Sequence, residues 1–282
     1  MDAGTIRMRV GLIQMNGSNI VQDNIDFAAN HIKHAAAQNI DLVQLPEIAN
    51  LVEKSSERLG EVLSDQASCP FLAAMQDLAH QHKIHIHIGS LALKNDLPPL
   101  AGQAQAQAVN RGFMLNDGGD ILAQYDKIHM FDVTLPDGEQ HYESKNYRAG
   151  SKQAIAKTSF GDYGLSICYD VRFAEHYRLM AQAGAMMLGV PAAFTQTTGR
   201  AHWHILLRAR AIECSAFVFA AAQVGNHHDG RKTYGHSLIV DPWGRIITDA
   251  GSHIGLIAAE IDLNQAVKVR SMIPAWSIET VL

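Results

Sequence analysis

The sequence is poor in cysteine. Its 282 residues include only Cys69, Cys168 and Cys214, and no two of them form a CxxC pair. An odd number of so few cysteines excludes a scaffold held together by disulfide bonds. It is typical of the reducing cytoplasm, where we expect this chain to be located. In that compartment a lone cysteine is either a core residue or a reactive thiol.

Long apolar runs are also missing. Residues 185–194 form the most apolar stretch, but Gly189 and Pro191 interrupt it, whereas a bilayer span requires roughly 20 apolar residues. Residues 1–15 lack a basic segment followed by an apolar stretch and a small-residue cleavage site, so we expect no secretory signal peptide. The sequence therefore predicts no membrane partner.

Positive charge is in deficit as well. Lys and Arg total 23 against 28 Asp and Glu, which gives a net charge of −5 with His neutral. Nucleic-acid binding depends on a basic surface that neutralises phosphates, so no nucleic-acid partner is expected. With 47% hydrophobic residues and ordinary counts of glycine (22) and proline (8), collagen-like and disordered classes are excluded. An enzyme acting on a small molecule is favoured.

Short apolar runs alternate with longer amphipathic segments along the chain. The patterns predict strands over 8–15, 42–45, 84–91, 164–168, 185–190, 217–223, 237–240 and 254–261, and helices over 24–38, 71–83, 172–183 and 201–213. A hairpin is predicted from 108–115 to 121–125, and 131–151 is predicted to be a long ordered loop. With no repeat and no linker, we expect a single α/β domain over 1–282, with a mixed sheet or two facing sheets flanked by helices.

Cys168 ends the apolar segment GLSIC, just before the point where a helix is expected to begin. A thiol at such a strand-to-helix turn is exposed at the sheet edge and lies near backbone N–H groups, which stabilise a thiolate or an oxyanion. The alternative is a buried structural cysteine, the commoner fate of this residue type. Cys214, inside a helical run, is interpreted as structural, and Cys69 as a loop residue.

Two charged residues have comparable settings. Glu47 follows the strand LVQLP, and open α/β sheets bind ligands at the carboxyl ends of their strands. Partial burial there would raise the pKa of its carboxyl toward the range of a general base. Lys127 ends the second strand of the hairpin, where a fixed ammonium would stabilise a tetrahedral oxyanion. Taken alone, each is more often an ordinary surface residue.

Taken together with their flanks LPE, YDKIHMFDV and CYDVRF, these three residues resemble the nitrilase superfamily of carbon–nitrogen hydrolases, whose catalytic Glu, Lys and Cys occur in this chain order. The resemblance extends from VGLIQM to VDPWGRII. The blocks PAAFTQTTGRAHW, LLRARAIE and YGHSLIVDPWG are most similar to the Nit branch, which contains ω-amidases and deaminated glutathione amidases. The PAAFT and TGRAHW blocks favour the latter.

The resemblance implies an αββα sandwich that assembles into homodimers or larger homo-oligomers. It also implies cofactor-free hydrolysis of a carboxamide to an acid and ammonia, through a thioester on Cys168. A second glutamate, Glu143, would orient Lys127, and the backbone N–H of Tyr169 would help to stabilise the oxyanion. The implied substrate is a small amide that carries a carboxylate, similar to deaminated glutathione.

Three further positions are predicted to contact the substrate. Arg172 is a candidate anchor for a substrate carboxylate, which a guanidinium holds in a two-point fork. Its alternative is an ion pair with Asp170 or Glu175. The resemblance implies that Phe194 and Thr198 line the acyl pocket.

Two departures from the family pattern leave the substrate open. The loop DVTLPDGEQHYES is longer than the DVDVPG-type block usual in the family, and Ala174 replaces a usual proline. Alternatives within the superfamily are an ω-amidase for 2-oxo acid amides, a broad aliphatic amidase and an N-carbamoyl amine hydrolase. A non-catalytic interaction subunit is disfavoured because the catalytic set is intact.

A metal site is the remaining alternative. His85 and His87 have the HxH spacing that binds zinc from one face of a strand. The other histidines are scattered through the sequence with no second compact ligand pair after a strand. We therefore interpret this pair as packed or solvated histidines and predict no metal.

Overall fold

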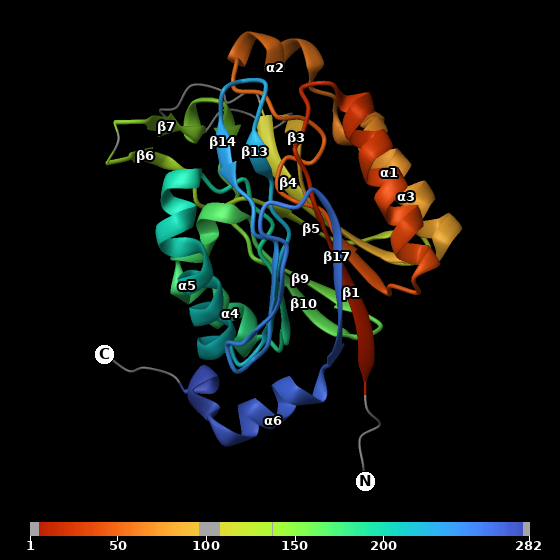
Figure 1. Ribbon diagram of the computed structural model, residues 1–282, viewed down its shortest axis with the longest axis vertical. Helices are drawn as coiled ribbons and strands as arrows, with labels where there is room; N and C mark the ends of the chain where they lie inside the picture. The colour runs from red at the N-terminus through yellow and green to blue at the C-terminus, as the bar shows by residue number, and fades with distance from the viewer. Residues whose placement is uncertain (1–5, 96–107, 137, 279–282) are drawn as a thin grey trace.

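The computed structural model describes residues 6–95, 108–136 and 138–278. Its framework is two mixed β-sheets that face each other (Figure 1). The first sheet has the order β17-β1-β2-β3-β4-β5, with β8 beside β4. Its strands are β1 (Arg7–Gln14), β2 (Leu42–Gln44), β3 (His85–Lys94), β4 (Ala108–Leu115), β5 (Ile121–Asp126), β8 (Tyr147–Arg148) and β17 (Gly255–Asp262).

The second sheet has the order β16-β15-β12-β11-β10-β9. Its strands are β9 (Ala154–Thr158), β10 (Gly161–Leu165), β11 (Met187–Gly189), β12 (Phe217–Ala220), β15 (Leu238–Val240) and β16 (Ile246–Asp249). Two short hairpins lie outside both sheets: β6 (Asp132–Thr134) with β7 (Gln140–Tyr142), and β13 (Val224–Asn226) with β14 (Lys232–Tyr234).

Helices cover the outer face of each sheet. Helices α1 (Val21–Ala37) and α3 (Pro70–His82) lie on the first sheet, and α4 (Ala174–Gln182) and α5 (Gln196–Cys214) lie on the second (Figure 1). Shorter helices are α2 (Ser56–Val62) and α6 (Asn264–Met272). The layers therefore follow the αββα order that the family resemblance implied, with one core between the sheets and another beneath α1 and α3.

Local chemistry explains where the predicted elements differ from the observed ones. Helix α5 begins at Gln196 and not at residue 201, because the Thr195 hydroxyl accepts a hydrogen bond from the Thr198 N–H and caps the helix. Strand β10 ends at Leu165, and a 3₁₀ helix, η3 (Cys168–Arg172), precedes α4. Cys168 is therefore the first residue of a helical turn and not the last residue of a strand.

The predicted loop over 131–151 contains more structure than expected. It includes the hairpin β6–β7, a 3₁₀ helix η2 (Glu143–Lys145) and strand β8. Asp137 of this loop lies outside the described residues. Residues 1–5, part of the segment in which no signal peptide is expected, also lie outside them. The three-residue strands are too short to reveal a period of two. Helices α2 and α6 and strands β9 and β16 were also not predicted.

The histidines of the HxH pair are packed inside the protein. His87 is buried, its Nδ1 lies 2.9 Å from Gln44 Nε2 and 3.0 Å from the Tyr163 hydroxyl, and burial lowers its pKa to about 3. The His85 ring contacts Phe160 edge-on, with centroids 5.1 Å apart. Within the described ranges, neither histidine belongs to a cluster of three potential metal ligands. The pair is therefore part of the core.

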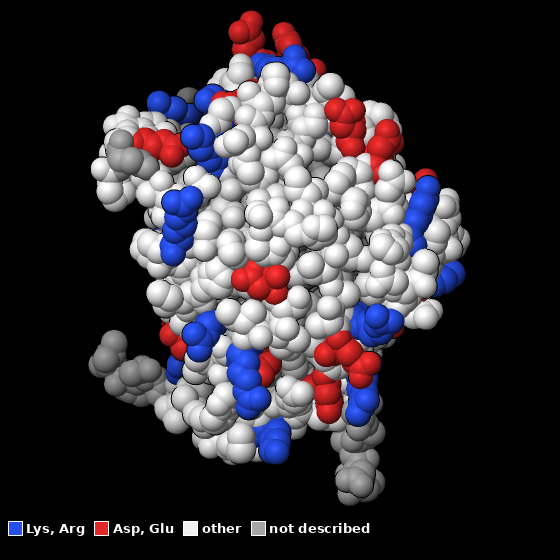
Figure 2. All heavy atoms as spheres, viewed as in Figure 1, with Lys and Arg blue, Asp and Glu red and all other residues white. Residues whose placement is uncertain are grey.

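None of the helices within the described ranges is both long enough and apolar enough to cross a membrane. Figure 2 shows one face of the molecule, on which Lys and Arg side chains are interspersed with Asp and Glu. On this face no single sign of charge gathers over one element.

Candidate active site

A cavity of about 490 Å³ lies where the connections after several strands of the two sheets meet. Five of the residues predicted to act in catalysis line it: Glu47, Lys127, Glu143, Cys168 and Tyr169. They come from positions far apart in the sequence, after β2, after β5, in η2 and in η3. The fold therefore brings together side chains that the sequence could only suggest one at a time.

Glu47 is held at the floor of this cavity by three hydrogen bonds. Its Oε1 accepts from Lys127 Nζ at 2.8 Å and from Asn110 Nδ2 at 2.9 Å, and its Oε2 accepts from the Ala193 N–H at 2.7 Å. The residue is only 4% exposed. A buried carboxylate with its lone pairs so occupied is fixed in orientation and charged.

Lys127 connects two carboxylates. Besides Glu47, its Nζ donates to Glu143 Oε1 at 2.9 Å and Oε2 at 2.8 Å. Glu143 is itself fixed, because its Oε2 accepts from the Phe131 N–H at 2.7 Å and its Oε1 from Asn110 Nδ2 at 3.2 Å. Two negative partners balance the buried ammonium and leave it little freedom to turn.

Cys168 occupies a strained backbone position beside Glu47. Its φ is +51°, which is uncommon for a residue with a Cβ, and its N–H donates to the Pro191 carbonyl at 2.8 Å. Its thiol lies beside the Glu47 carboxylate, whose charge acts on it. The residue is buried, at 7% exposed. The expectation of an exposed thiol is therefore wrong: the turn directs it into the cavity wall between packed elements.

The ionisation of this cluster follows from burial and mutual charge. Burial opposes ionisation of Glu47, but Lys127 and the hydrogen bonds outweigh it and lower the pKa of the carboxyl. This is opposite to the rise expected from burial alone. Burial likewise opposes the charge of Lys127, yet Glu143 and Glu47 raise its pKa well above the usual value. Burial and the Glu47 charge raise the pKa of the Cys168 thiol. At neutral pH the site holds a carboxylate, an ammonium and a thiol.

Of the predicted substrate contacts, Phe194 and Thr198 line the cavity, whereas Arg172 is not among its lining residues. The Arg172 guanidinium lies over the Phe194 ring, 5.3 Å from its centroid, with its Nη atoms 3.3 Å from His202 Nδ1. The alternative partner, Asp170, instead accepts hydrogen bonds from the Tyr125 hydroxyl and from the N–H of His129. Arg172 as a carboxylate anchor stays a prediction.

Two polar residues of the cavity were missed. Asn110 holds both Glu47 and Glu143, and a polar residue in a buried strand was the available signal. Arg231 donates from Nε to Asp229 Oδ2 at 2.6 Å, while its Nη2 is buried with no hydrogen-bond partner among the described residues. Nothing in the sequence around Arg231 distinguishes it from a surface arginine.

Comparisons with known proteins agree with this geometry. The carbon-nitrogen hydrolase family matches residues 9–271. The chain is 40% identical over 268 residues to a protein named deaminated glutathione amidase from Synechocystis, covering 93% of this chain and 94% of the relative. Among solved structures, the Caenorhabditis elegans NitFhit protein superposes with a TM-score of 0.87 at 34% identity, covering 97% of this chain and 65% of that longer one. Nit3 of Saccharomyces cerevisiae, described as a member of branch 10 of the nitrilase superfamily, gives 0.81 at 29% identity, covering 95% and 94%.

Proposed function

The chain is an enzyme of the carbon–nitrogen hydrolase family, and from that premise we propose that it hydrolyses a small, carboxylate-bearing amide through a thioester on Cys168. One observation carries the proposal: the buried carboxylate of Glu47 accepts a hydrogen bond from the Lys127 ammonium and lies beside the Cys168 thiol in the same cavity. A nucleophile, its base and a fixed cation in mutual contact are what acyl transfer requires.

In the first half of the reaction, Cys168 Sγ attacks the amide carbon and its proton moves to Glu47. The carbonyl oxygen becomes an oxyanion, which Lys127 and the Tyr169 backbone N–H stabilise. Since all the Lys127 contacts go to carboxylates, the oxyanion takes the place of one contact to Glu143. Collapse of the intermediate breaks the C–N bond, and Glu47 returns its proton to the leaving nitrogen.

In the second half, water attacks the thioester carbon while Glu47 accepts one of its protons. A second tetrahedral oxyanion forms at the same position and uses the same donors. Its collapse releases the carboxylic acid and returns the proton to the Cys168 sulfur. Glu47 therefore alternates between base and acid. Burial raises the pKa of its carboxyl and the Lys127 charge lowers it, so the two influences act in opposite directions.

For the substrate we propose a deaminated glutathione-like amide, as the name of the Synechocystis relative suggests. Arg231 lines the cavity, and its Nη2 is buried with no hydrogen-bond partner among the described residues; we propose that a substrate carboxylate pairs with this guanidinium. Leaving a buried charged donor unsatisfied is costly, so its pairing would favour anionic substrates. Arg231 is therefore a second candidate anchor for the substrate carboxylate, besides Arg172.

The leaving group matters for the assay. Glutathione is γ-glutamyl-cysteinyl-glycine, so hydrolysis of the γ-amide of its deaminated form releases a dipeptide amine and not ammonia. The ammonia expected from the sequence is therefore the product only for an ω-amidase substrate such as 2-oxoglutaramate, which has the same acyl group. Parallel measurement of amine release and ammonia release across these amides and a ureido acid tests the proposal. Higher kcat/KM for an uncharged aliphatic amide or the ureido acid would contradict it.

We also propose self-association through the outer helices of the second sheet, as the resemblance implied. Large apolar side chains are exposed there, on α4 at Leu179 and on α5 at Ile205 and Ile212. Changing Ile205 and Ile212 to Glu should shift the mass measured by light scattering toward the monomer. A mass unaffected by these changes would contradict this interface. A cytoplasmic location fits the three free cysteines, and cell fractionation would test it.

A further inference from the structure

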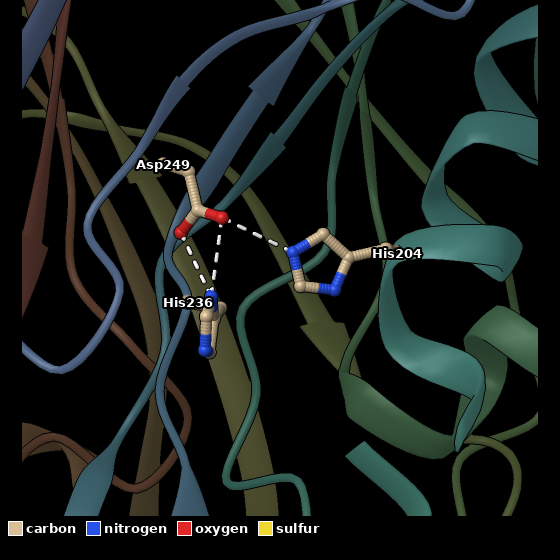
Figure 3. A group of neighbouring side chains, drawn as sticks. All are labelled: His204, His236 and Asp249. Atoms are coloured by element: carbon tan, nitrogen blue, oxygen red, sulfur yellow. Dashed lines mark hydrogen bonds and ion pairs between the residues drawn. The ribbon is translucent and has the colours of Figure 1, made fainter. Parts of the chain in front are cut away.

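Three potential ligand side chains converge beside α5, and none of them is among the residues that line the cavity. His204 comes from α5, His236 from the connection between β14 and β15, and Asp249 from the end of β16 (Figure 3). The Asp249 carboxylate lies between the two rings: Oδ2 is 3.1 Å from His204 Nε2, and Oδ1 is 3.0 Å from His236 Nδ1. Within the described ranges this is the only cluster of three such groups whose ligand atoms all lie within 4.8 Å of one another.

The backbone holds two of these residues in place. The His236 N–H donates to the Gly251 carbonyl at 2.8 Å, and the His236 carbonyl accepts from Trp203 Nε1 at 2.9 Å. The His236 ring stacks on Tyr234 with centroids 4.3 Å apart. Asp249 Oδ1 accepts from the Gly251 N–H at 2.7 Å. The cluster is therefore preorganised by contacts other than those between its own members.

We propose that His204, His236 and Asp249 bind a divalent transition-metal ion, of which zinc is the best match. Two imidazole nitrogens and a carboxylate oxygen are ligands that zinc prefers, and bond lengths of about 2.0–2.1 Å place neighbouring ligands about 3.3 Å apart in a tetrahedron. The two N···O separations of 3.0 and 3.1 Å need a small expansion, and the two imidazole nitrogens, which lie within 4.8 Å of each other, must move closer together by side-chain rotation. Because these side chains are 29–31% exposed, water can supply the fourth ligand.

Binding requires a lone pair at each nitrogen that now faces the carboxylate. Each neutral imidazole provides it by carrying its proton on the other ring nitrogen, and an imidazolium provides it by releasing one proton to solvent. The metal replaces the hydrogen bonds between Asp249 and the two imidazoles with three coordinate bonds.

The proposed metal has a structural role. None of the three ligands is among the residues that line the cavity, and Tyr234 lies between the cluster and the start of α5, where a Cβ on Gly199 would come within 2.3 Å of the tyrosine ring. A metal at this position ties α5 to β16 and to the β14–β15 connection. It should therefore raise the stability of the fold without taking part in amide hydrolysis.

The test is titration of the full chain with Zn²⁺ by calorimetry, and with Co²⁺ by its visible d–d absorption. Cys168→Ala serves as the background, because the cavity thiol is itself a zinc ligand. We expect one ion per chain and a thermal midpoint that rises by several degrees with zinc in excess. His204→Ala and Asp249→Asn should each weaken binding by at least about tenfold. His34→Ala, at an exposed position on α1, is the matched control and should bind as the background does.

Folding of each variant is verified separately by making the same change in the chain that retains Cys168 and measuring amide hydrolysis. Equal zinc affinity in the background, His204→Ala and Asp249→Asn would overturn the proposal, since the ion would then lie elsewhere. Absence of binding to the background at millimolar zinc would also overturn it and would leave Asp249 as an acceptor of two imidazole hydrogen bonds. A six-coordinate cobalt spectrum would contradict the tetrahedral geometry.

Discussion

The Nζ atom of Lys127 lies 2.8 Å from Oε1 of Glu47, and both side chains are buried. An ion pair taken out of water is stable only when further hydrogen bonds compensate its desolvation. Here Glu143 supplies that compensation on the lysine side, and Asn110 and the Ala193 N–H supply it on the glutamate side. The pair is therefore one part of a network, and its members should not tolerate substitution independently.

The first prediction concerns Glu143 as the residue that positions Lys127. Glu143→Gln keeps the side-chain shape but removes one of the two charges that balance the buried ammonium. We expect kcat to fall about tenfold to a hundredfold and stability to fall by roughly 1.5–3 kcal/mol, the value of a charged hydrogen bond. Steady-state kinetics and urea unfolding measure the two effects. Glu175→Gln, at an exposed position on α4, is the control and should change neither.

A merely structural role for Glu143 would give a different result. Folded Glu143→Gln protein would then turn over at the wild-type rate once its lower stability is allowed for. A lysine that has lost its second carboxylate should also lose part of the upward shift of its pKa, because Glu143 raises that pKa. The alkaline limb of the pH profile should therefore move to lower pH in this variant.

The second prediction is the pH dependence of kcat/KM. The pKa of Glu47 is lowered, so the carboxylate form persists as pH falls through the ordinary carboxyl range of about 4.3. Activity should be lost only below that value. The pKa of the Cys168 thiol is raised, so the thiol form persists through neutral pH. The rate should consequently be flat between about pH 6 and 8 for an amide that does not itself titrate.

A preformed thiolate would behave otherwise. If the ionised sulfur were the resting nucleophile, kcat/KM would rise about tenfold per pH unit below the thiol pKa. Circular dichroism at each pH separates loss of structure from loss of the base. A rising profile between pH 6 and 8 in folded protein would therefore contradict proton transfer to Glu47 during the attack.

The third prediction concerns the covalent intermediate. Cys168→Ala should abolish turnover while leaving the fold intact, because it removes a single sulfur atom and keeps the Cβ that the positive φ already accommodates. Cys168→Ser should be nearly inactive, since a hydroxyl is a far weaker nucleophile. Glu47→Gln should also be nearly inactive, because Glu47 accepts the thiol proton during the attack and a proton from water during hydrolysis of the thioester. Cys214→Ala, which removes a thiol elsewhere, should remain active.

Iodoacetamide and a chelator separate thiol chemistry from metal chemistry. If the nucleophile is Cys168, iodoacetamide destroys activity and EDTA does not change it. Under the metal site proposed at His204, EDTA should lower the thermal midpoint of a zinc-loaded chain while its rate at room temperature stays constant. Rate loss that zinc restores would instead indicate a metallohydrolase.

Catalytic residues that lie in short, distinctive sequence blocks could be predicted, whereas features of the site that depend on tertiary packing could not. Glu47, Lys127 and Cys168 each lie in a distinctive block next to a strand end, so their place at one edge of the fold was foreseeable. The burial of Cys168 was not, because η3 turns the backbone into the left-handed region and packs the thiol under neighbouring loops. The local sequence pattern does not indicate that turn.

The proposed metal ligands could not be predicted from the sequence either. His204, His236 and Asp249 are separated by 32 and 13 residues, counted from their numbers, and come from a helix, a loop and a strand. Ligand spacing in a sequence reveals a site only when the ligands share one element or adjacent turns. The HxH pair had that spacing and is packed in the core instead, because its strand, β3, is buried on both faces.

The last prediction decides which arginine anchors the substrate carboxylate. Arg231 lines the cavity and has a buried Nη2 with no partner in the described part of the chain, whereas Arg172 lies over Phe194 and contacts His202. Arg231→Met should therefore cost about tenfold to a hundredfold in kcat/KM for a carboxylate-bearing amide, corresponding to roughly 1.5–3 kcal/mol. It should cost much less for the uncharged amide of similar length. Arg231→Lys should rescue only in part, because an ammonium cannot form the two-point fork.

Two variants serve as comparisons. Lys232→Met removes a charge from the same cavity wall without removing the unpartnered buried donor, so it isolates the effect of net charge. Arg172→Met tests the assignment made from the sequence. If Arg172→Met loses discrimination between the two amides and Arg231→Met does not, the carboxylate binds at Arg172. Equal losses on both amides in Arg231→Met would mean that this arginine only stabilises the β13–β14 hairpin through Asp229.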